Sequence, residues 1–148
     1  MRIPPPVLAV AIATATIVGS RFMAPSWPVG AFLSYLALGV AILGTAVDLS
    51  SKSLFATRET TVNPMTPGAA TVIVDSGAYR WSRNPMYVGR LLQLLALSLY
   101  LASPVGLVCV PIVAIYLDRV QVRAEERALS ERFPLEFAKY CSRVRRWV

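Results

Sequence analysis

The sequence contains no histidine and only two cysteines. The first absence removes the commonest general base and the commonest protein ligand of metal ions. Two cysteines do not make a disulfide framework. Cys109 lies in an apolar stretch and Cys141 in a basic tail, so both are expected to be free thiols. Any chemistry is therefore expected to use carboxylates, phenols, amides and arginines, without a metal site.

Charge is also scarce, because only 16% of the residues are charged and 55% are hydrophobic. This composition excludes an ordinary soluble domain. Charged side chains are absent from three stretches of about the length, roughly 20 residues, that a bilayer span needs. These stretches are Ile3–Ser20, Phe22–Val47 and Leu91–Leu117. The chain is therefore predicted to be an all-α integral membrane protein, with residues 1–148 forming a single membrane domain.

The first apolar stretch has an alternative interpretation as a secretory signal, because Arg2 precedes a run rich in alanine and threonine. Three consecutive prolines, Pro4 to Pro6, stand at its start, and the run leads directly into another hydrophobic segment. We therefore favour a membrane helix over a signal.

The third stretch is too long for one span. A single helix from Pro85 to Leu117 would measure about 50 Å at 1.5 Å per residue, against a hydrocarbon core of roughly 30 Å. Ser103-Pro104 interrupts the stretch and favours a helical hairpin, with a single kinked helix as the alternative. The prediction is four transmembrane helices, at about 6–21, 29–49, 85–102 and 105–121, the last two forming the hairpin.

Two polar regions flank these helices, a loop at 50–83 and C-terminal amphipathic helices within 122–148. On a helix, Val122, Glu125, Glu126, Leu129 and Phe133 share one face. Pro134 interrupts this helix, and a second short helix follows from about Leu135.

Basic residues gather in residues 48–90 and 118–148. Positive charge marks the cytoplasmic side of a membrane protein, so both termini and the loop at 50–83 are predicted to be cytoplasmic. Anionic lipid is the expected partner of this charge, in preference to nucleic acid.

Four polar residues are expected to meet at the cytoplasmic end of the hairpin. Arg83 and Tyr87 begin its first helix, and Glu125 and Glu126 follow its second. Such a group suits a zwitterionic cofactor with hydroxyl groups and a positive centre. Each residue also has a simpler interpretation, as an interfacial anchor, a helix start, a solvated charge or part of an aromatic belt.

An ordered set of motifs resembles the isoprenylcysteine carboxyl methyltransferase family, which shares a superfamily with the phospholipid N-methyltransferases. The set consists of Gly77-Ala78-Tyr79, Arg83-Asn84-Pro85-Met86-Tyr87-Val88-Gly89, Ser103-Pro104 and Glu125-Glu126-x-x-Leu129 with Phe133. Thr60-Thr61-Val62-Asn63-Pro64 is similar to the small bacterial branch, which implies a bacterial cytoplasmic membrane. The resemblance covers about residues 57–148.

The resemblance implies S-adenosylmethionine as cofactor, with Arg83 and Glu126 as catalytic residues. The cofactor-binding residues it implies are Tyr79, Arg83, Asn84, Pro85, Tyr87, Gly89, Glu125, Glu126 and Tyr140. The chain departs from the family pattern at Asn84, where histidine is usual, and at Phe133-Pro134-Leu135-Glu136-Phe137, where the family has Phe-Gly-x-x-Tyr.

The resulting expectation is methyl transfer to a hydrophobic or lipid-like acceptor, such as the carboxylate of a prenylated cysteine. Two alternatives stay open. One is N-methylation of a phospholipid or S-methylation of a small thiol, and the other is a non-enzymatic membrane scaffold or lipid-binding protein.

Overall fold

The computed structural model describes residues 5–22, 30–57 and 72–148, and over these ranges it is helical, with turns and without a β-strand. The predicted turn around Trp27 and the Thr60–Pro64 motif lie outside the described residues. Both cysteines are free, as predicted.

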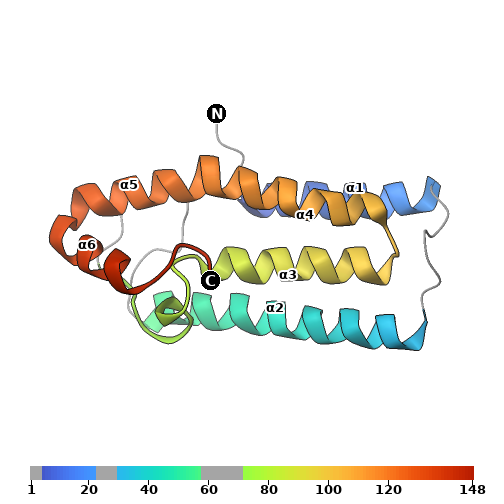
Figure 1. Ribbon diagram of the computed structural model, residues 1–148, viewed down its shortest axis with the longest axis horizontal. Helices are drawn as coiled ribbons and strands as arrows, with labels where there is room; N and C mark the ends of the chain where they lie inside the picture. The colour runs from blue at the N-terminus through green and yellow to red at the C-terminus, as the bar shows by residue number, and fades with distance from the viewer. Residues whose placement is uncertain (1–4, 23–29, 58–71) are drawn as a thin grey trace.

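Four helices lie along one common direction, α1 (Pro5–Phe22), α2 (Ala31–Thr57), α3 (Pro85–Tyr100) and α4 (Pro104–Tyr116) (Figure 1). Helix α3 contacts the other three, and its largest contact is with α2. The central position of α3 places its first turns, which carry the Arg83–Gly89 motif, among the other elements at one end of the molecule.

Helix α2 is longer than the sequence predicted, since it continues to Thr57 through residues assigned to the loop at 50–83. Its polar residues find partners along the helix itself. Ser51 donates a hydrogen bond of 2.6 Å to the Val47 carbonyl, and Lys52 pairs with Asp48 one turn earlier. Local hydrogen bonds of this kind let a polar segment stay helical. A short 3₁₀ turn, η2 (Gly77–Arg80), also lies within the predicted loop.

Helices α3 and α4 lie side by side and are joined by Leu101, Ala102 and Ser103 (Figure 1). Ala102 has a positive φ of 46°, and the Ser103 hydroxyl caps α4 by accepting a hydrogen bond from the Gly106 amide at 3.2 Å. The 16 residues of α3 correspond to about 24 Å of helix, which is shorter than the bilayer core. The crossing of the membrane by all four helices therefore stays a prediction.

Helix α4 does not stop at the predicted residue 121. It continues through a six-residue π-helical segment, η3 (Leu117–Val122), directly into α5 (Arg123–Arg132). Pro134 then begins α6 (Pro134–Arg143), which folds back toward the start of α3, and residues 144–148 are not helical. The predicted break at Pro134 is confirmed, whereas the predicted boundary between the membrane helix and the C-terminal helices is absent.

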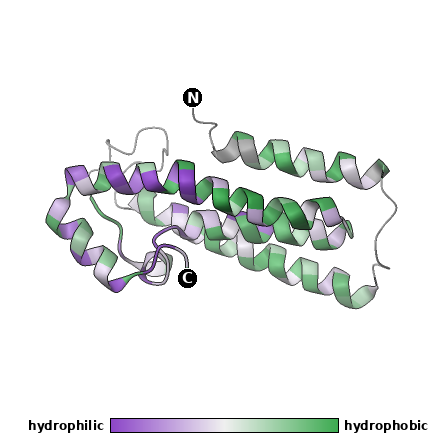
Figure 2. Cartoon of the chain, turned by 45° about the horizontal axis from the view of Figure 1, so that its top comes forward, coloured by the Kyte–Doolittle hydropathy of each residue, from purple (hydrophilic) through white to green (hydrophobic). Residues whose placement is uncertain are grey.

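The outer surfaces of the long helices are apolar, and polar residues gather at the end that carries α5, α6 and the C-terminus (Figure 2). Within the described ranges, two helical segments are long and apolar enough to cross a bilayer, Ala31–Phe55 and Pro104–Arg132. Large hydrophobic side chains are exposed on both and on α1, among them Val10, Phe32, Ile42, Val108 and Ile115. This surface is the one that a lipid environment requires.

Candidate functional site

The C-terminal segment pairs with the loop that leads into α3. The Arg83 amide donates to the Arg145 carbonyl and the Asn84 side-chain amide donates to the Arg146 carbonyl, each at 2.9 Å. Asn84 occupies the N-cap position of α3, but its side chain does not cap the helix. Pro85 starts α3 and is buried. The side chain of Asn84 therefore binds the C-terminal segment, residues 144–148, which is called the tail below.

Glu126 forms ion pairs with two arginines from different parts of the chain. An Arg83 terminal nitrogen lies 3.0 Å from Glu126 Oε1, and Arg146 Nη2 lies 2.6 Å from Glu126 Oε2. The side chains of Arg83 and Glu126 are only 14% and 16% exposed. Arg146 also reaches Asp118, which accepts a hydrogen bond of 3.0 Å from the Trp147 indole. The tail is thus attached to η3 and α5 through side chains as well as to α3.

Glu125 faces the same region from the adjacent position. Its Oε1 accepts hydrogen bonds of 2.6 Å from the Tyr87 hydroxyl and from the Gln121 side-chain amide. Gln121 is 1% exposed and belongs to the π-helical segment. π-Helical turns are frequent at functional sites. The structure therefore brings together Arg83, Tyr87, Glu125 and Glu126, the four residues predicted to meet; they are called the carboxylate cluster below.

Tyr79 and Tyr140 lie close to this cluster. The Tyr140 hydroxyl donates a hydrogen bond of 2.8 Å to the Tyr79 carbonyl, and the Tyr79 ring meets Phe55 edge-on at 5.4 Å. Burial raises the pKa of both phenols well above their ordinary value. Both side chains therefore remain neutral, and both hold η2 against α2 and α6.

Gly89 has a packing role in the structure. A Cβ atom built at Gly89 would lie 2.7 Å from the Gly44 carbonyl oxygen and 2.9 Å from the Asp48 amide. Only glycine permits so close an approach of two helices. Positions 87 and 89 differ by about 200° around a helix, so Gly89 faces α2 while Tyr87 faces Glu125. A contact of Gly89 with a cofactor stays a prediction.

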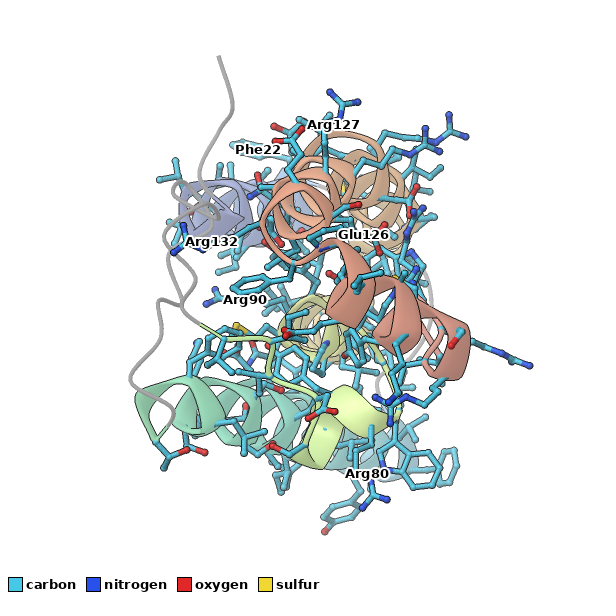
Figure 3. The ribbon with its side chains drawn as sticks, turned by 90° about the vertical axis from the view of Figure 1, so that its left-hand side faces the viewer. Phe22, Arg80, Arg90, Glu126, Arg127 and Arg132 are labelled. Carbon is cyan, nitrogen blue, oxygen red and sulfur yellow. The ribbon has the colours of Figure 1, made fainter. Side chains whose placement is uncertain are left out.

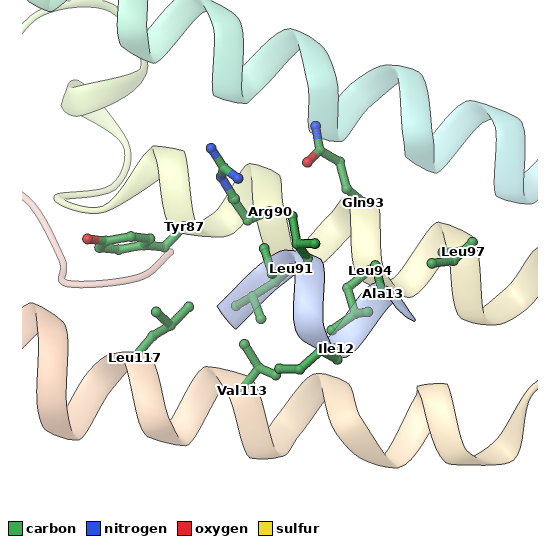
Figure 4. A pocket seen from close by; sticks show the side chains of 12 residues that line it. Ile12, Ala13, Tyr87, Arg90, Leu91, Gln93, Leu94, Leu97, Val113 and Leu117 are labelled. Carbon is green, nitrogen blue, oxygen red and sulfur yellow. The ribbon is translucent and has the colours of Figure 1, made fainter. Parts of the chain in front are cut away.

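An apolar cavity of about 270 Å³ lies between α1, α3 and α4 and reaches the carboxylate cluster at Tyr87 (Figure 4). Its lining is mostly aliphatic. It consists of Ala9, Val10, Ile12, Ala13, Tyr87, Arg90, Leu91, Gln93, Leu94, Leu97, Val113 and Leu117. Tyr87 is thus shared, since its ring lines the cavity and its hydroxyl binds Glu125.

The structure also places around the site several residues that carry little signal in the sequence. From the sequence, Arg146 and Trp147 belong to a basic tail, Gln121 to the predicted helix at 105–121 and Asp48 to the predicted helix at 29–49. Arg146, Gln121 and Trp147 contact Glu126, Glu125 and Asp118. The one sequence signal was Asp48, a lone acidic residue at the end of a 26-residue run without charge; such residues mark functional positions in membranes.

The comparisons with known proteins agree with these motifs. A family described as phospholipid methyltransferase matches residues 32–136. The protein-S-isoprenylcysteine O-methyltransferase of Saccharomyces cerevisiae is 34% identical over 73 residues, which are 49% of this chain and 30% of the yeast protein. The chain thus covers about a third of the length of that relative. No solved structure matches.

The family match takes in α2, α3, α4, η3 and α5, and therefore the whole carboxylate cluster. Because it spans well over half of the sequence, this chain belongs to the phospholipid methyltransferase family.

Proposed function

We propose that the chain is an integral membrane methyltransferase that uses S-adenosylmethionine and methylates a hydrophobic or lipid-like acceptor. One observation carries the proposal. Tyr87 lines the apolar cavity and hydrogen-bonds Glu125, so the carboxylate cluster and a cavity for an apolar molecule meet at one side chain. A methyl donor at the cluster and an acceptor in the cavity would be neighbours, as direct transfer requires.

The residues of the cluster fit the cofactor chemically. S-Adenosylmethionine carries a carboxylate, an ammonium group, ribose hydroxyls and a sulfonium centre. Arg83 Nε is buried and has no hydrogen-bond partner among the described residues, so a bound carboxylate that reached it would satisfy this donor. Glu125 and Glu126 supply acceptors for hydroxyl and ammonium groups. We assign the two glutamates to holding the cofactor and Arg83 to orienting it.

Methyl transfer requires mainly that the methyl donor and the acceptor are held in position. When bound, S-adenosylmethionine supplies an electrophilic methyl group; an acceptor lone pair forms the new bond to that carbon, while the C–S electron pair leaves with sulfur. Positive charge is lost from the sulfonium, so a dry and fixed site is sufficient. A carboxylate acceptor arrives deprotonated, which makes the absence of histidine no obstacle. The aliphatic cavity wall would exclude water from the transfer.

A phospholipid amine is a second candidate acceptor, because the family description names phospholipids. An amine must lose a proton on methylation, and a carboxylate need not. The relative from yeast is named for O-methylation. The two candidates therefore differ in product, an ester sensitive to base or a base-stable methylamine.

The arrangement also supports a membrane topology. We infer that α1 to α4 all cross the bilayer and that both termini lie on the cytoplasmic side with the carboxylate cluster. The exposed apolar surface of these helices and the polar end in Figure 2 support this orientation.

The test is methyl incorporation. Purified protein in liposomes made from bacterial lipid extract, with methyl-labelled S-adenosylmethionine, should produce labelled lipid-soluble product. Release of labelled methanol by base would identify an ester. A Glu125→Gln variant that remains folded should lose most of the incorporation. Equal incorporation by wild type and variant would contradict the assignment, and no incorporation by a wild type that binds the cofactor would direct attention to a missing acceptor class.

A further inference from the structure

Two cations share one buried carboxylate where α2 and α3 meet. Asp48, whose side chain is 7% exposed, pairs with Lys52 on its own helix, and Arg90 Nε lies 3.9 Å from Asp48 Oδ1. The separation of 3.9 Å exceeds hydrogen-bond length, and Asp48 Oδ1 makes no hydrogen bond within the described residues. Taken together, these three side chains carry a net charge of +1.

Arg90 also lines the apolar cavity, so this excess positive charge lies beside a space bounded by aliphatic side chains. The Arg90 side chain is 28% exposed. Figure 4 shows Arg90 between Tyr87 and Gln93 along one side of the cavity, with its guanidinium directed toward α2. An arginine beside an apolar space within a membrane protein is costly unless an anion accompanies it. Asp48 supplies only part of that compensation.

The position of Arg90 relates it to the carboxylate cluster. It follows Tyr87 by three residues, which is about 4.5 Å along the helix axis. Beyond Arg90 the cavity is lined by Leu94, Leu97 and Ile12. A molecule with its head at Arg90 would place that head one helical turn from Tyr87 and its tail among leucines. The volume of about 270 Å³ lies just below the roughly 300–1,000 Å³ range of small-molecule sites, which favours a single chain over a two-chain lipid.

We propose that Arg90 binds the anionic head group of a single-chain amphiphile, with its tail in the cavity between α1, α3 and α4, and that this contact selects the methyl acceptor. The claim that Arg90 binds an anion is argued from the Asp48–Arg90 geometry and the cavity. The claim that this contact selects the methyl acceptor rests on the proposed methyltransferase function. Arg90 is thus a specificity-determining residue, and Asp48 tunes the strength of the anion site by withdrawing part of its charge.

The test uses electron paramagnetic resonance of spin-labelled lipids in phosphatidylcholine liposomes that contain the full-length protein. The probes are stearic acid labelled on its chain, its methyl ester, and a chain-labelled phosphatidylcholine. The fraction of immobilised probe gives the relative association constant of each. Above the pKa of the bound acid, the wild type should prefer the carboxylate over the ester by about tenfold, the size expected for one charge-assisted hydrogen bond.

Variants at Arg90 and at Asp48 should change the preference for the carboxylate in opposite directions. Arg90→Gln should remove the preference for the carboxylate, Arg90→Lys should retain part of it, and Asp48→Asn should increase it. Arg80→Gln is the matched control, because Arg80 is an exposed arginine on η2 outside the cavity lining (Figure 3). Circular dichroism and S-adenosylmethionine affinity identify variants that have lost their fold.

Each outcome decides the proposal. An unchanged carboxylate preference in folded Arg90→Gln and Arg90→Lys would overturn it, as would equal immobilisation of phosphatidylcholine and stearic acid in the wild type. Loss of the preference on Arg90→Gln, with cofactor affinity intact, would support it. A wild type that shows the preference but does not bind S-adenosylmethionine would retain the anion site and contradict the proposed methyltransferase function.

Discussion

Tyr87 and Glu125 are joined by a hydrogen bond of 2.6 Å from the phenol hydroxyl to Oε1, although 38 residues separate them in the chain. The bond connects the first turn of α3 to the first turn of α5. It fixes the wall between the apolar cavity and the carboxylate cluster, because the Tyr87 ring belongs to the cavity lining.

Replacing Tyr87 by phenylalanine should keep the cavity wall and remove this donor from Glu125. We expect a loss of about 1–3 kcal/mol in the free energy of unfolding, the usual cost when one partner of a buried hydrogen bond is removed, together with weaker cofactor binding. Denaturant titration and calorimetry measure the two effects. Tyr100→Phe is the control, since Tyr100 is 58% exposed at the other end of α3. Equal behaviour of the two variants would contradict a special role for Tyr87.

Arg146 should hold the C-terminal segment against the carboxylate cluster through its 2.6 Å contact with Glu126. Arg146→Gln keeps hydrogen-bonding groups but removes the charge. The Arg83 amide, which donates to the Arg145 carbonyl, should then exchange its hydrogen about tenfold faster, as expected when a charge-assisted contact that holds the tail is lost. Arg145→Gln changes an exposed neighbour and should leave the exchange as it is. Unchanged protection of the Arg83 amide in Arg146→Gln would show that the hydrogen bonds accepted by the Arg145 and Arg146 carbonyls from Arg83 and Asn84 are sufficient to hold the tail.

Gly89→Ala should separate α2 from α3. The new methyl group would lie within 3 Å of backbone atoms of Gly44 and Asp48, and these atoms cannot move without the helix. We expect destabilisation of about 1–3 kcal/mol, typical of overpacking, measured by thermal unfolding in detergent. Gly39→Ala, on the same helix pair with nothing within 4 Å, should not be destabilising. A harmless Gly89→Ala substitution would mean that the two helices are not in close contact.

The buried phenols predict a dependence of stability on alkaline pH. Burial raises the pKa of Tyr140 above the unfolded value of about 10. Below pH 10 the phenol is neutral in both states, so its contribution to stability is fully present. As the pH rises above 10, the unfolded chain loses the proton first, and stability falls until the folded-state pKa is reached. Tyr140→Phe should therefore be less stable near pH 8, through loss of the hydrogen bond to Tyr79, but should show a smaller further loss above pH 10. Denaturant midpoints from pH 8 to 11.5 test this, and parallel curves for the two proteins would contradict it.

The sequence alone was sufficient for the helical class and the break at Pro134, because apolar runs and proline mark them locally. It was also sufficient for the meeting of Arg83 and Tyr87 with Glu125 and Glu126, because an antiparallel hairpin brings its two ends together. The end of α2 was missed because its serines satisfy their hydrogen bonds within the helix, which composition does not reveal. Arg146 and Gln121 were missed because their partners depend on how α6 and the tail fold back. The packing of Gly89 against α2 could not be predicted from the motif, because it depends on how closely the two helices approach.

The central claim is that the carboxylate cluster binds S-adenosylmethionine, and calorimetry on detergent-purified protein tests it most directly. The wild type should bind, and a Glu125→Ala/Glu126→Ala double variant of preserved helicity should not. Arg127→Ala serves as the control, since Arg127 is exposed and points away from the cluster (Figure 3). Absence of binding by a well-folded wild type, or undiminished binding by the double variant, would contradict the account.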